Sequence, residues 1–457
     1  MDSQRIRVLA TAFAAVPGSS PHGAALLAMA AAIRADLDLV TLKTETLSHV
    51  ERMGEARMFR VPTGQVSQHE QRAVFGRAIA RQLESEHYDV VHVRGPFEGA
   101  VAASKKARLG FQLIYEMATF PDEALGPATE KRWADSHANT MAEADLVLVP
   151  TEAAQRALAE SVSPERIQVL PPGVDVGVFD WRKTRTVAAP RLLYLGSFTA
   201  DRDLVTLLGA IRRVSKHHSM SALFAGDTDR ERRNNLRTMV QAFGLESIVE
   251  VRGEPVSRLL PQIIAGASLC VAPAAETPRF QSFGDLPQPL LEYFACHRPV
   301  IAAGVPGVSD VVRDEQEGLL YPPGDENALV ESIQQMWSHA ELRDRTTEAG
   351  YRKVRDVFSL GARQRRLADL YERMFPGSQV GDPWIEAFDE PQTGSFATST
   401  SVVSMWNEEH SETMRPEEGQ VSDAEPRDTM GPMRRDTDPS VLASEATRVS
   451  AMPEGES

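Results

Sequence analysis

Residues 286–307 read LPQPLLEYFACHRPVIAAGVPG, and this stretch sets the fold class of the chain. A loop with two prolines leads into a short apolar helix, and the chain then turns into a buried strand, PVIAAG. A helix that feeds directly into an apolar strand is the repeating unit of α/β proteins. The helix carries one acid, Glu292, and the role of that carboxylate is the question that the stretch raises.

The same alternation runs along most of the chain. Twelve apolar strand-like segments are separated by helical stretches, at 5–13, 36–42, 88–95, 111–118, 145–151 and 167–175, and again at 191–198, 221–227, 248–254, 267–274, 298–304 and 318–324. Such alternation predicts parallel sheets covered by helices on both faces. We expect two facing Rossmann-like domains, at 1–185 and 186–359, joined near the polar segment that ends in Pro190. A closing helix at 360–376 is expected to pack back on the first domain.

Charge narrows the class of function. The net charge of the 457 residues is −15, but residues 377–457 hold 17 acids against 5 arginines, which is −12 and leaves only −3 for the rest. A nearly neutral body offers no basic face for nucleic acid. The two cysteines, Cys270 and Cys296, sit in apolar runs, which indicates neither a disulfide framework nor a cysteine zinc site. This pattern fits a reducing cytoplasm.

Both ends of the chain carry features to interpret. The apolar run after Arg5 and Arg7 is short and is followed by a loop and a helix, so we interpret it as a first strand and not as a signal peptide. No run reaches the roughly 18 apolar residues of a membrane helix. Residues 377–457 are rich in Ser, Thr, Pro and acids, which predicts a disordered acidic tail. Its apolar islands, 382–388 and 401–406, are either inert or dock a protein partner.

Ligands of open parallel sheets bind at the carboxyl ends of the strands. After one strand, Gly196 allows close approach of backbone, and Arg202 lies near the start of the next helix, where a guanidinium fork suits a diphosphate. The alternative is an exposed arginine paired with a neighbouring aspartate. The turn Gly253-Glu254-Pro255 follows another strand, and its backbone groups suit a nucleobase.

Glu292 and one further acidic motif have competing interpretations. An ionised acid on an apolar helix is costly unless it is hydrogen-bonded, and the two hydroxyls of a ribose would satisfy it. A salt bridge or a helix-terminus role explains it equally well on charge grounds. The motif Asp227-Thr228-Asp229 superficially matches a metal-holding sequence, but it follows a strand and opens a helix, so we interpret it as a helix cap.

These residues lie in segments that resemble a known family. Residues 286–333 look like the donor-site signature of the family 4 retaining glycosyltransferases, which have the GT-B fold of two facing Rossmann-like domains. Residues 143–158, 166–179 and 192–211 resemble further family segments in the same order. The resemblance covers about residues 5–376. It implies a hexosyltransferase-type enzyme that uses a nucleoside diphosphate sugar as co-substrate, with no bound cofactor and no metal.

The resemblance implies roles for individual residues of the second domain. Glu292 falls on the second motif glutamate, which holds the donor ribose, and Arg202 falls on the position that clamps the pyrophosphate. The other residues expected around the donor are Gly196, Ser197, Gly253, Glu254, Pro289 and Leu290. The first motif glutamate, eight positions before the second, is replaced by Gly284. Glu276 lies sixteen positions before Glu292 and could stand in for it only if the loop 273–285 carries an eight-residue insertion; a third catalytic role is expected for Glu276 on that basis.

In the first domain, the resemblance implies an acceptor side built by loops after the strands. The residues expected there are Gly18, His22, Gly23, His92, Arg94, Glu116 and Thr119. The histidine that many members place after the strand ending at Glu116 is absent. Pro289 stands where one branch of the family has a lysine, which puts one donor phosphate contact in doubt.

The expected function is therefore sugar transfer with retention to a glycan or lipid-linked acceptor, in polysaccharide or glycoconjugate synthesis. Peripheral contact at the inner membrane face is left open, although Lys105, Lys106 and Arg108 form the only tight basic cluster. Two rivals remain. One is a GT-B pseudoenzyme that binds nucleotide or glycan and recruits partners through its tail, motivated by the missing glutamate. The other, favoured less by residues 304–325, is a nucleotide-sugar epimerase on the same fold.

Overall fold

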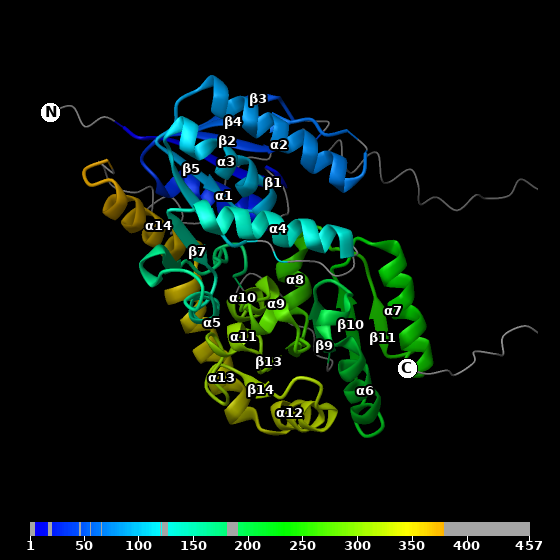
Figure 1. The fold of residues 1–457 in the computed structure, drawn as a ribbon. Helices are drawn as coiled ribbons and strands as arrows, with labels where there is room; N and C mark the ends of the chain where they lie inside the picture. Colours follow the sequence, from blue (N-terminus) through cyan, green and yellow to red (C-terminus); the bar gives the residue numbers. More distant parts are fainter. Residues whose placement is uncertain are drawn as a thin grey trace, which may run out of the picture. The chain divides into compact units, whose positions relative to one another are not determined.

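The computed structural model contains two α/β domains, each built on one sheet (Figure 1). It describes residues 5–16, 21–44, 47–54, 56–64, 66–118, 120, 127–180 and 191–378. The first sheet has eight strands and the second has six. This matches the expected architecture of two Rossmann-like domains.

The first sheet has the strand order β3-β4-β2-β1-β5-β6-β7-β8. Its strands are β1 (Arg7–Ala15), β2 (Asp36–Leu42), β3 (Val50–Met53), β4 (Ala56–Val61), β5 (Val90–Val93), β6 (Gln112–Glu116), β7 (Leu146–Val149) and β8 (Ile167–Val169). All neighbours pair in parallel except β3, which pairs antiparallel with β4. The strand order reverses direction between β1 and β5, because β1 leads to β2 on one side and β5 lies on the other.

The strands β3 and β4 are absent from the sequence-based expectation, which placed six strands in this half. Two arginines, Arg57 and Arg60, interrupt the apolar residues of β4, and β3 is mostly exposed at the edge of the sheet. A short strand at a sheet edge buries one face at most, so it lacks the continuous apolar run that marks a central parallel strand. The expectation of an all-parallel first sheet was therefore wrong at this edge.

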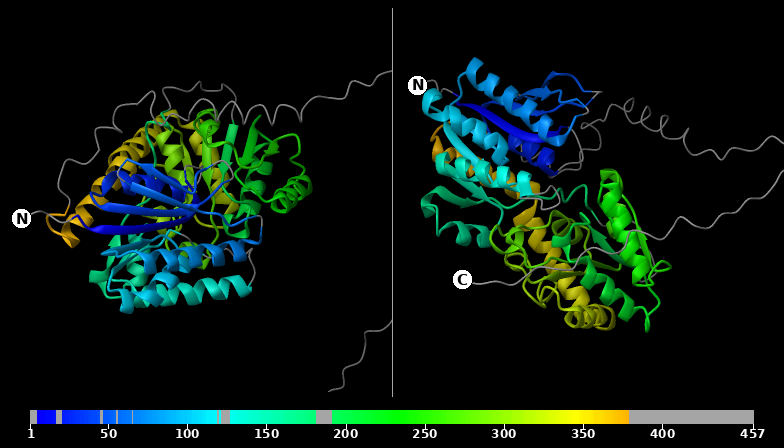
Figure 2. Two further views of the ribbon diagram at one scale, coloured as in Figure 1. Left: turned by 90° about the horizontal axis from the view of Figure 1, so that it is seen from above. Right: turned by 45° about the vertical axis from the view of Figure 1, so that its right-hand side comes forward.

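Helices cover both faces of the first sheet. Three of them, α2 (Gln68–Ser85), α3 (Pro96–Leu109) and α4 (Pro127–Glu143), lie side by side over one face, which Figure 2 shows from a second direction. On the other face α1 (Pro21–Ala32) packs against α14 (Leu360–Met374). Leu367, Leu370 and Tyr371 of α14 belong to the same buried cluster as the strands of this sheet. The last helix therefore adds its apolar face to the core of the first domain.

The second sheet is parallel throughout, in the order β11-β10-β9-β12-β13-β14. Its strands are β9 (Arg191–Leu195), β10 (Ser221–Ala225), β11 (Val249–Val251), β12 (Leu269–Ala272), β13 (Val300–Ala303) and β14 (Leu319–Tyr321). The helices associated with it are α6 (Leu204–Val214), α7 (Arg230–Ala242), α8 (Leu260–Ala265), α9 (Pro278–Gln281), α10 (Gln288–Ala295), α11 (Pro306–Ser309), α12 (Glu326–Ser338) and α13 (Ala340–Lys353). Each of its six strands was expected from the sequence.

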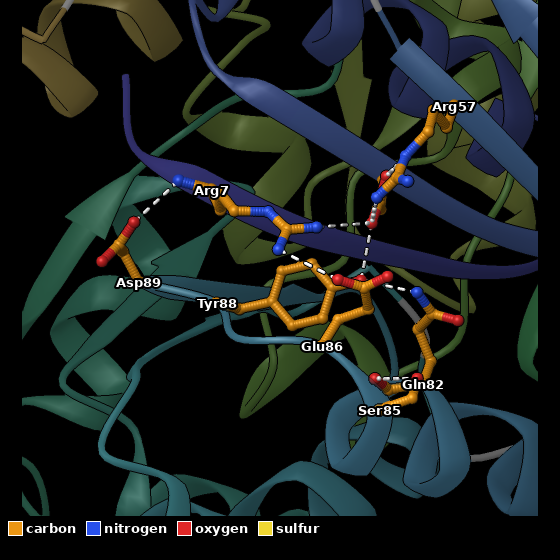
Figure 3. Close-up of polar contacts among 8 residues, drawn as sticks. Arg7, Arg57, Gln82, Ser85, Glu86, Tyr88 and Asp89 are labelled. Carbon is orange, nitrogen blue, oxygen red and sulfur yellow. Dashed lines mark hydrogen bonds and ion pairs between the residues drawn. The ribbon is translucent and has the colours of Figure 1, made fainter. Parts of the chain in front are cut away.

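A polar network fixes the amino ends of the first sheet (Figure 3). The buried carboxylate of Asp38 accepts two hydrogen bonds of 2.7 Å from the Arg57 guanidinium and one of 2.6 Å from the Tyr88 hydroxyl. The backbone N–H of Arg7 donates to Asp89, just before β5. Every polar group in this network has a partner. The network lies at the amino ends of the strands, whereas ligands of parallel sheets bind at the carboxyl ends, so we interpret it as structural.

Short polar contacts join the two domains. The N-cap of α5 (Glu152–Leu158) is Thr151, whose hydroxyl donates 2.8 Å to the carbonyl of Gly284. The backbone N–H of Ala153 donates 2.6 Å to the carboxylate of Asp310, and the side-chain amide of Gln288 donates 3.1 Å to the carbonyl of Gly173. The loop before α10, the first residue of α10 and the residue after α11 are thereby attached to the first domain.

Candidate functional site

Three glycines lie side by side at the carboxyl ends of β9, β10 and β11. The N–H of Gly196 donates 2.9 Å to the carbonyl of Ala225, and the N–H of Gly226 donates 3.3 Å to the carbonyl of Gly253. A Cβ added to Gly226 would lie 2.8 Å from the backbone nitrogen of Gly196, which real structures do not tolerate. The strand ends therefore need glycine in order to pack, and they form a surface of bare backbone that a flat ring can approach.

Arg202 lies on the loop that follows β9. It ends a single 3₁₀ turn, Ala200–Arg202, and α6 begins two residues later after Asp203, which adopts a left-handed conformation with φ of 46°. The arginine is only 9% exposed, so the alternative of a solvated surface side chain was wrong. Its guanidinium lies 3.8 Å from the Asp201 carboxylate, 3.9 Å from that of Asp285 and 5.3 Å from the centre of the Phe280 ring.

Those two ion pairs are too long to be hydrogen bonds. Across the described ranges, no hydrogen bond reaches the Arg202 guanidinium, and its Nε is buried without a partner. A guanidinium carries five N–H donors, and a buried one that leaves them unused is costly. Arg202 therefore has the donors and the positive charge to bind an oxyanion.

Arg279 is a residue of this site that the sequence reasoning missed. Its Nε donates a hydrogen bond of 2.7 Å to the Asp285 carboxylate, and its Nη1 donates one of 3.2 Å to the Asp201 carboxylate. Arg279 thus holds both carboxylates at hydrogen-bond distance, while Arg202 stays at the longer distance. The two arginines and two aspartates balance in charge, and the division of contacts leaves the donors of Arg202 available. Only the loop fold brings residues 201, 279 and 285 together, and no sequence signal marks Arg279.

Glu292 lies in the middle of α10. Its side chain is partly exposed, and burial raises the pKa of its carboxyl to about 7. No hydrogen bond or ion pair to this carboxyl is found in the part of the chain that the structure describes. The salt-bridge alternative for Glu292 is therefore not supported. The next residue, Tyr293, accepts a hydrogen bond of 2.7 Å from the N–H of Leu195 through its hydroxyl, which ties α10 to the end of β9.

The position of the missing motif glutamate cannot hold a side chain. Gly284 has φ of +56°, and a Cβ there would lie 2.6 Å from the hydroxyl of Thr151 and 2.7 Å from the backbone nitrogen of Ala154. Glu276 is exposed in the bend between β12 and α9, and no contact of its side chain is present among the residues described. The structure thus shows where Glu276 lies and gives it no partner that would mark it as catalytic.

The remaining residues expected around the donor are placed as follows. The hydroxyl of Ser197 contacts that of Thr199 at 3.0 Å, and its carbonyl accepts 2.6 Å from Tyr194. Glu254 is exposed after β11. Pro289 and Leu290 lie in the first turn of α10, where proline is tolerated because the N–H has no helical partner.

Several residues expected on the acceptor side form a buried network with α14. The carboxylate of Glu116 accepts a hydrogen bond of 2.9 Å from Arg363 and lies 2.8 Å from the guanidinium of Arg94. His92 lies 3.4 Å from the same carboxylate, and its Nδ1 contacts the Tyr371 hydroxyl at 3.0 Å. Burial opposes ionisation of Glu116, but the two arginines and His92 hold its pKa well below the usual range.

This network gives His92 and Glu116 a structural role in attaching the last helix. The participation of Arg363 and Tyr371 could not be expected from the sequence, because it depends on the return of α14 across more than two hundred residues.

Arg94 also contacts the start of α1. Its Nη1 donates 3.0 Å to the carbonyl of His22, and burial, together with Arg94, lowers the pKa of His22 to about 4. Gly23 packs closely, because a Cβ there would lie 3.1 Å from the carbonyl of Ala15. Gly18 and Thr119, the other two expected residues, lie outside the described residues.

Two sequence interpretations are settled by contacts. Asp229 is the N-cap of α7 and accepts from the N–H of Arg232, so the helix-cap interpretation is confirmed. Asp227 accepts hydrogen bonds from backbone N–H groups and from the Arg232 side chain.

The basic cluster is neutralised locally, since Lys105 and Arg108 both pair with Glu84 and Lys106 pairs with Asp145. Among the helices described, none is long and apolar enough to cross a membrane.

Known protein families match both domains. The family described as "Glycosyl transferase 4-like domain" matches residues 18–173, and "Glycosyl transferases group 1" matches residues 189–339. A D-inositol 3-phosphate glycosyltransferase of Nocardioides is 26% identical over 66% of this chain and 72% of its own length. An alpha-D-kanosaminyltransferase of Streptomyces kanamyceticus is 25% identical over 40% of this chain and 46% of its own length, so the match spans about half of that relative.

Solved structures agree on the fold. The sucrose-phosphate synthase of Thermosynechococcus elongatus superposes with a TM-score of 0.67 at 22% identity, covering 81% of this chain and 99% of that one. HepE of Anabaena, solved with UDP and glucose, superposes with a TM-score of 0.64 at 16% identity, covering 80% of this chain and 100% of that one. These likenesses establish the GT-B architecture, and the two family profiles together account for most of both domains. The chain belongs to the family 4 glycosyltransferases with the GT-B fold.

Proposed function

We propose that the chain transfers a sugar from a nucleoside diphosphate sugar to an acceptor hydroxyl, with retention of anomeric configuration. The observation that carries the proposal is the Arg202 guanidinium, which is largely buried and has no hydrogen-bond partner in the described ranges. A buried arginine in the loop after β9, at the carboxyl edge of a parallel sheet, suits the diphosphate of such a donor.

Further features of the second domain support the same ligand. The bare backbone at Gly196, Gly226 and Gly253 suits the base, and the unpartnered Glu292 carboxyl suits the two ribose hydroxyls. HepE, one of the similar structures, was solved with UDP-glucose, which gives a chemical precedent for the donor class on this fold.

The protein contributes to this reaction mainly by positioning the reactants and by stabilising the charge that develops. The bond between the anomeric carbon and the phosphate oxygen breaks, and negative charge develops on the leaving diphosphate. Arg202 stabilises that charge without reorganising, because Arg279, Asp201 and Asp285 already hold it in place. The acceptor oxygen bonds to the anomeric carbon on the face that the phosphate leaves, and the leaving phosphate oxygen takes the acceptor proton. Such a route needs no enzymic base at position 284.

The acceptor is proposed to be a sugar or glycan hydroxyl; among the relatives, the name D-inositol 3-phosphate glycosyltransferase mentions a small polar molecule. A second candidate function is a pseudoenzyme that binds the nucleotide without turning it over. It is supported by the absence of a side chain at position 284 and by the exposed, uncontacted Glu276.

The test is to incubate the full chain with UDP-, GDP-, ADP- and TDP-sugars and to measure both thermal stabilisation and release of the nucleoside diphosphate. Ligand at about a hundred times its dissociation constant adds about 2.7 kcal/mol of stability. We expect one base class to stabilise the chain and to be released slowly, and Glu292→Gln to lose both effects. Stabilisation with no release or transfer would favour the pseudoenzyme, and no stabilisation by any nucleotide would exclude both.

A further inference from the structure

A cavity of about 690 Å³ lies in the first domain between α2, α3 and α4, on the helix layer that Figure 2 shows. Its lining includes Phe13 near the end of β1, Phe97 and Glu98 in the first turn of α3, and Arg72 of α2. The volume is in the range of small-molecule sites. None of the residues expected to bind a substrate lies in this lining.

The position of the cavity in the fold favours ligand binding. The strand order of the first sheet reverses between β1 and β5. Phe13 lies in the last part of β1, and Phe97 lies in the first turn of α3, which follows β5. In open α/β sheets, the crevice beside this reversal is where ligands bind. The cavity therefore lies beside the reversal in strand order, where the starts of helices and the neighbouring loops come together.

Arg72 is the residue that gives the cavity its chemistry. Its guanidinium lies 4.3 Å from the centre of the Phe13 ring and 4.7 Å from that of Phe97, so two aromatic faces hold it in place. No hydrogen bond or ion pair reaches it from any of the residues described. Burial lowers the pKa of Arg72, and the nearby Glu98 opposes this. A fixed guanidinium fork with its donors unused is built to receive a carboxylate or phosphate.

Glu98 is a second, independent indication. Its side chain is 3% exposed and lines the cavity, and its Oε2 is buried without a hydrogen-bond partner in the described part of the chain. Burial raises the pKa of this carboxyl, against the attraction of Arg72, and backbone N–H groups of Glu98 and Phe13 donate to it. The cavity thus has one buried carboxyl oxygen without a hydrogen-bond partner among the described residues, on a side chain close to Arg72.

The remainder of the lining is divided in character. Phe13, Phe75 and Phe97 supply an apolar floor, while Arg77 and Arg132 stand exposed at the rim. Arg132 contacts the His69 ring at 2.9 Å across the opening between α4 and α2. A ligand that fills this cavity has an apolar part on the aromatic side chains and an anionic group at Arg72.

We propose that this cavity is a subsite for an acceptor that carries a phosphate or carboxylate next to an apolar moiety, with Arg72 binding the oxyanion. The inference rests on the proposed function only in naming the ligand an acceptor. The cavity itself is separate from the residues assigned to the donor.

The test measures binding of phenyl phosphate to the full chain by calorimetry, beside phenol and glucose 1-phosphate, which each present one half of the chemistry. We expect phenyl phosphate to bind most tightly of the three. Arg72→Met keeps an apolar side chain against the phenylalanine rings. It should weaken the binding of phenyl phosphate by about tenfold or more. The matched control is Arg77→Met, on the same helix and at the rim of the same cavity, which removes the same charge and should change the affinity about twofold at most.

Several outcomes would overturn the inference: no binding of phenyl phosphate, equal affinity for glucose 1-phosphate, or equal weakening by the two methionine variants. If Arg72→Met does not fold, Arg72→Lys decides, because lysine keeps the charge and loses the fork. Affinity for phenyl phosphate unchanged in that variant contradicts the proposal, and weakening supports it. Nucleotide binding, measured on the same samples with Glu292→Gln, reports on the donor site alone, so failure of the proposed function and failure of this subsite are told apart.

Discussion

The hydroxyl of Thr151, which caps α5 in the first domain, donates a hydrogen bond of 2.8 Å to the carbonyl of Gly284 in the second. This contact occupies the position at which the resembled family has its first motif glutamate. The backbone of Gly284 is left-handed and its surroundings are filled, so the chain uses this position to attach a loop to the first domain. Any catalysis must proceed without an acid there.

A side chain at position 284 should destabilise the protein through packing as well as through backbone strain. Gly284→Ala would place a Cβ within 2.7 Å of two atoms of α5 and its cap, and Gly110→Ala, at φ of +78°, would meet nothing within 4 Å. We expect Gly110→Ala to cost about 1 kcal/mol and Gly284→Ala about 2–4 kcal/mol in urea unfolding. Equal losses of unfolding free energy in the two variants would mean that Thr151 and α5 move aside for the added Cβ without destabilising the protein.

The Glu292 carboxyl should discriminate between ribose and deoxyribose. A hydrogen bond to a charged group contributes about 1.5–3 kcal/mol. The nucleoside diphosphate that stabilises the chain should therefore bind about 10- to 100-fold more tightly than its 2′-deoxy form, by calorimetry. In Glu292→Gln this preference should shrink several-fold. A wild-type chain that binds both forms alike would show that Glu292 does not contact the sugar ring hydroxyls.

The same carboxyl should make stability depend on pH in an unusual direction. Burial raises the pKa of Glu292 from 4.5 to about 7, so the native chain holds a proton that the unfolded chain has released. The free energy of unfolding should fall as the pH rises from about 4.5 to 7, by up to about 3 kcal/mol, and then level off. Glu292→Gln should therefore match the wild type near about pH 5 and be more stable near about pH 8.

Glu317 provides a control of opposite sign. It is buried, which opposes ionisation, but Arg313 holds its pKa below the ordinary value. Its contribution to stability is present above about pH 4.5 and is lost as the pH falls through its lowered pKa. Glu317→Gln should thus be destabilising near about pH 8, where Glu292→Gln is stabilising. Urea unfolding of both variants at the two pH values checks the pair, and a shared sign would refute the assignment for Glu292.

The last helix should depend on one buried ion pair. Arg363 is 2% exposed and donates hydrogen bonds of 2.9 Å to Glu116 and 2.9 Å to the carbonyl of Pro171. Arg363→Met removes both bonds but leaves Glu116 paired with Arg94, so it should cost about 2–4 kcal/mol and raise hydrogen exchange across α14. The control is Arg365→Met, exposed on the same helix, which should change stability by about 0.5 kcal/mol at most. Equal protection of α14 in both variants would show that apolar packing alone holds it.

Much of the fold could be predicted because central parallel strands are buried on both faces and so appear as continuous apolar runs. The four inner strands of the second sheet, β10, β9, β12 and β13, have this property, and all six strands of that sheet were expected. The edge strand β3 was missed because its side chains are exposed, and β4 was missed because Arg57 and Arg60 interrupt its apolar run. The parallel pairing of the twelve expected strands follows from alternation with helices and needs no tertiary information.

The candidate site divides in the same way. Arg202 and Glu292 could be proposed as donor-binding residues from the sequence, Arg202 because it lies near a helix start and Glu292 because an ionised acid on an apolar helix is costly. Arg279 and Arg72 could not be identified, because their meaning lies in what surrounds them: two aspartates from different loops in one case, and two phenylalanine rings and an open cavity in the other.

The sequence by itself determined the α/β class, the two sheets and the family resemblance, and it singled out Glu292 and Arg202 as candidates for donor binding, since these depend on local pattern and on the cost of burying charge. The tertiary structure alone decided which polar groups are satisfied. It joined Glu116 and His92 to α14, filled position 284 with a contact from the other domain, and left the guanidinium groups of Arg72 and Arg202 without a hydrogen bond from any described residue. Satisfaction of a polar group depends on neighbours far away in the chain, and only the folded chain brings those neighbours within hydrogen-bond distance.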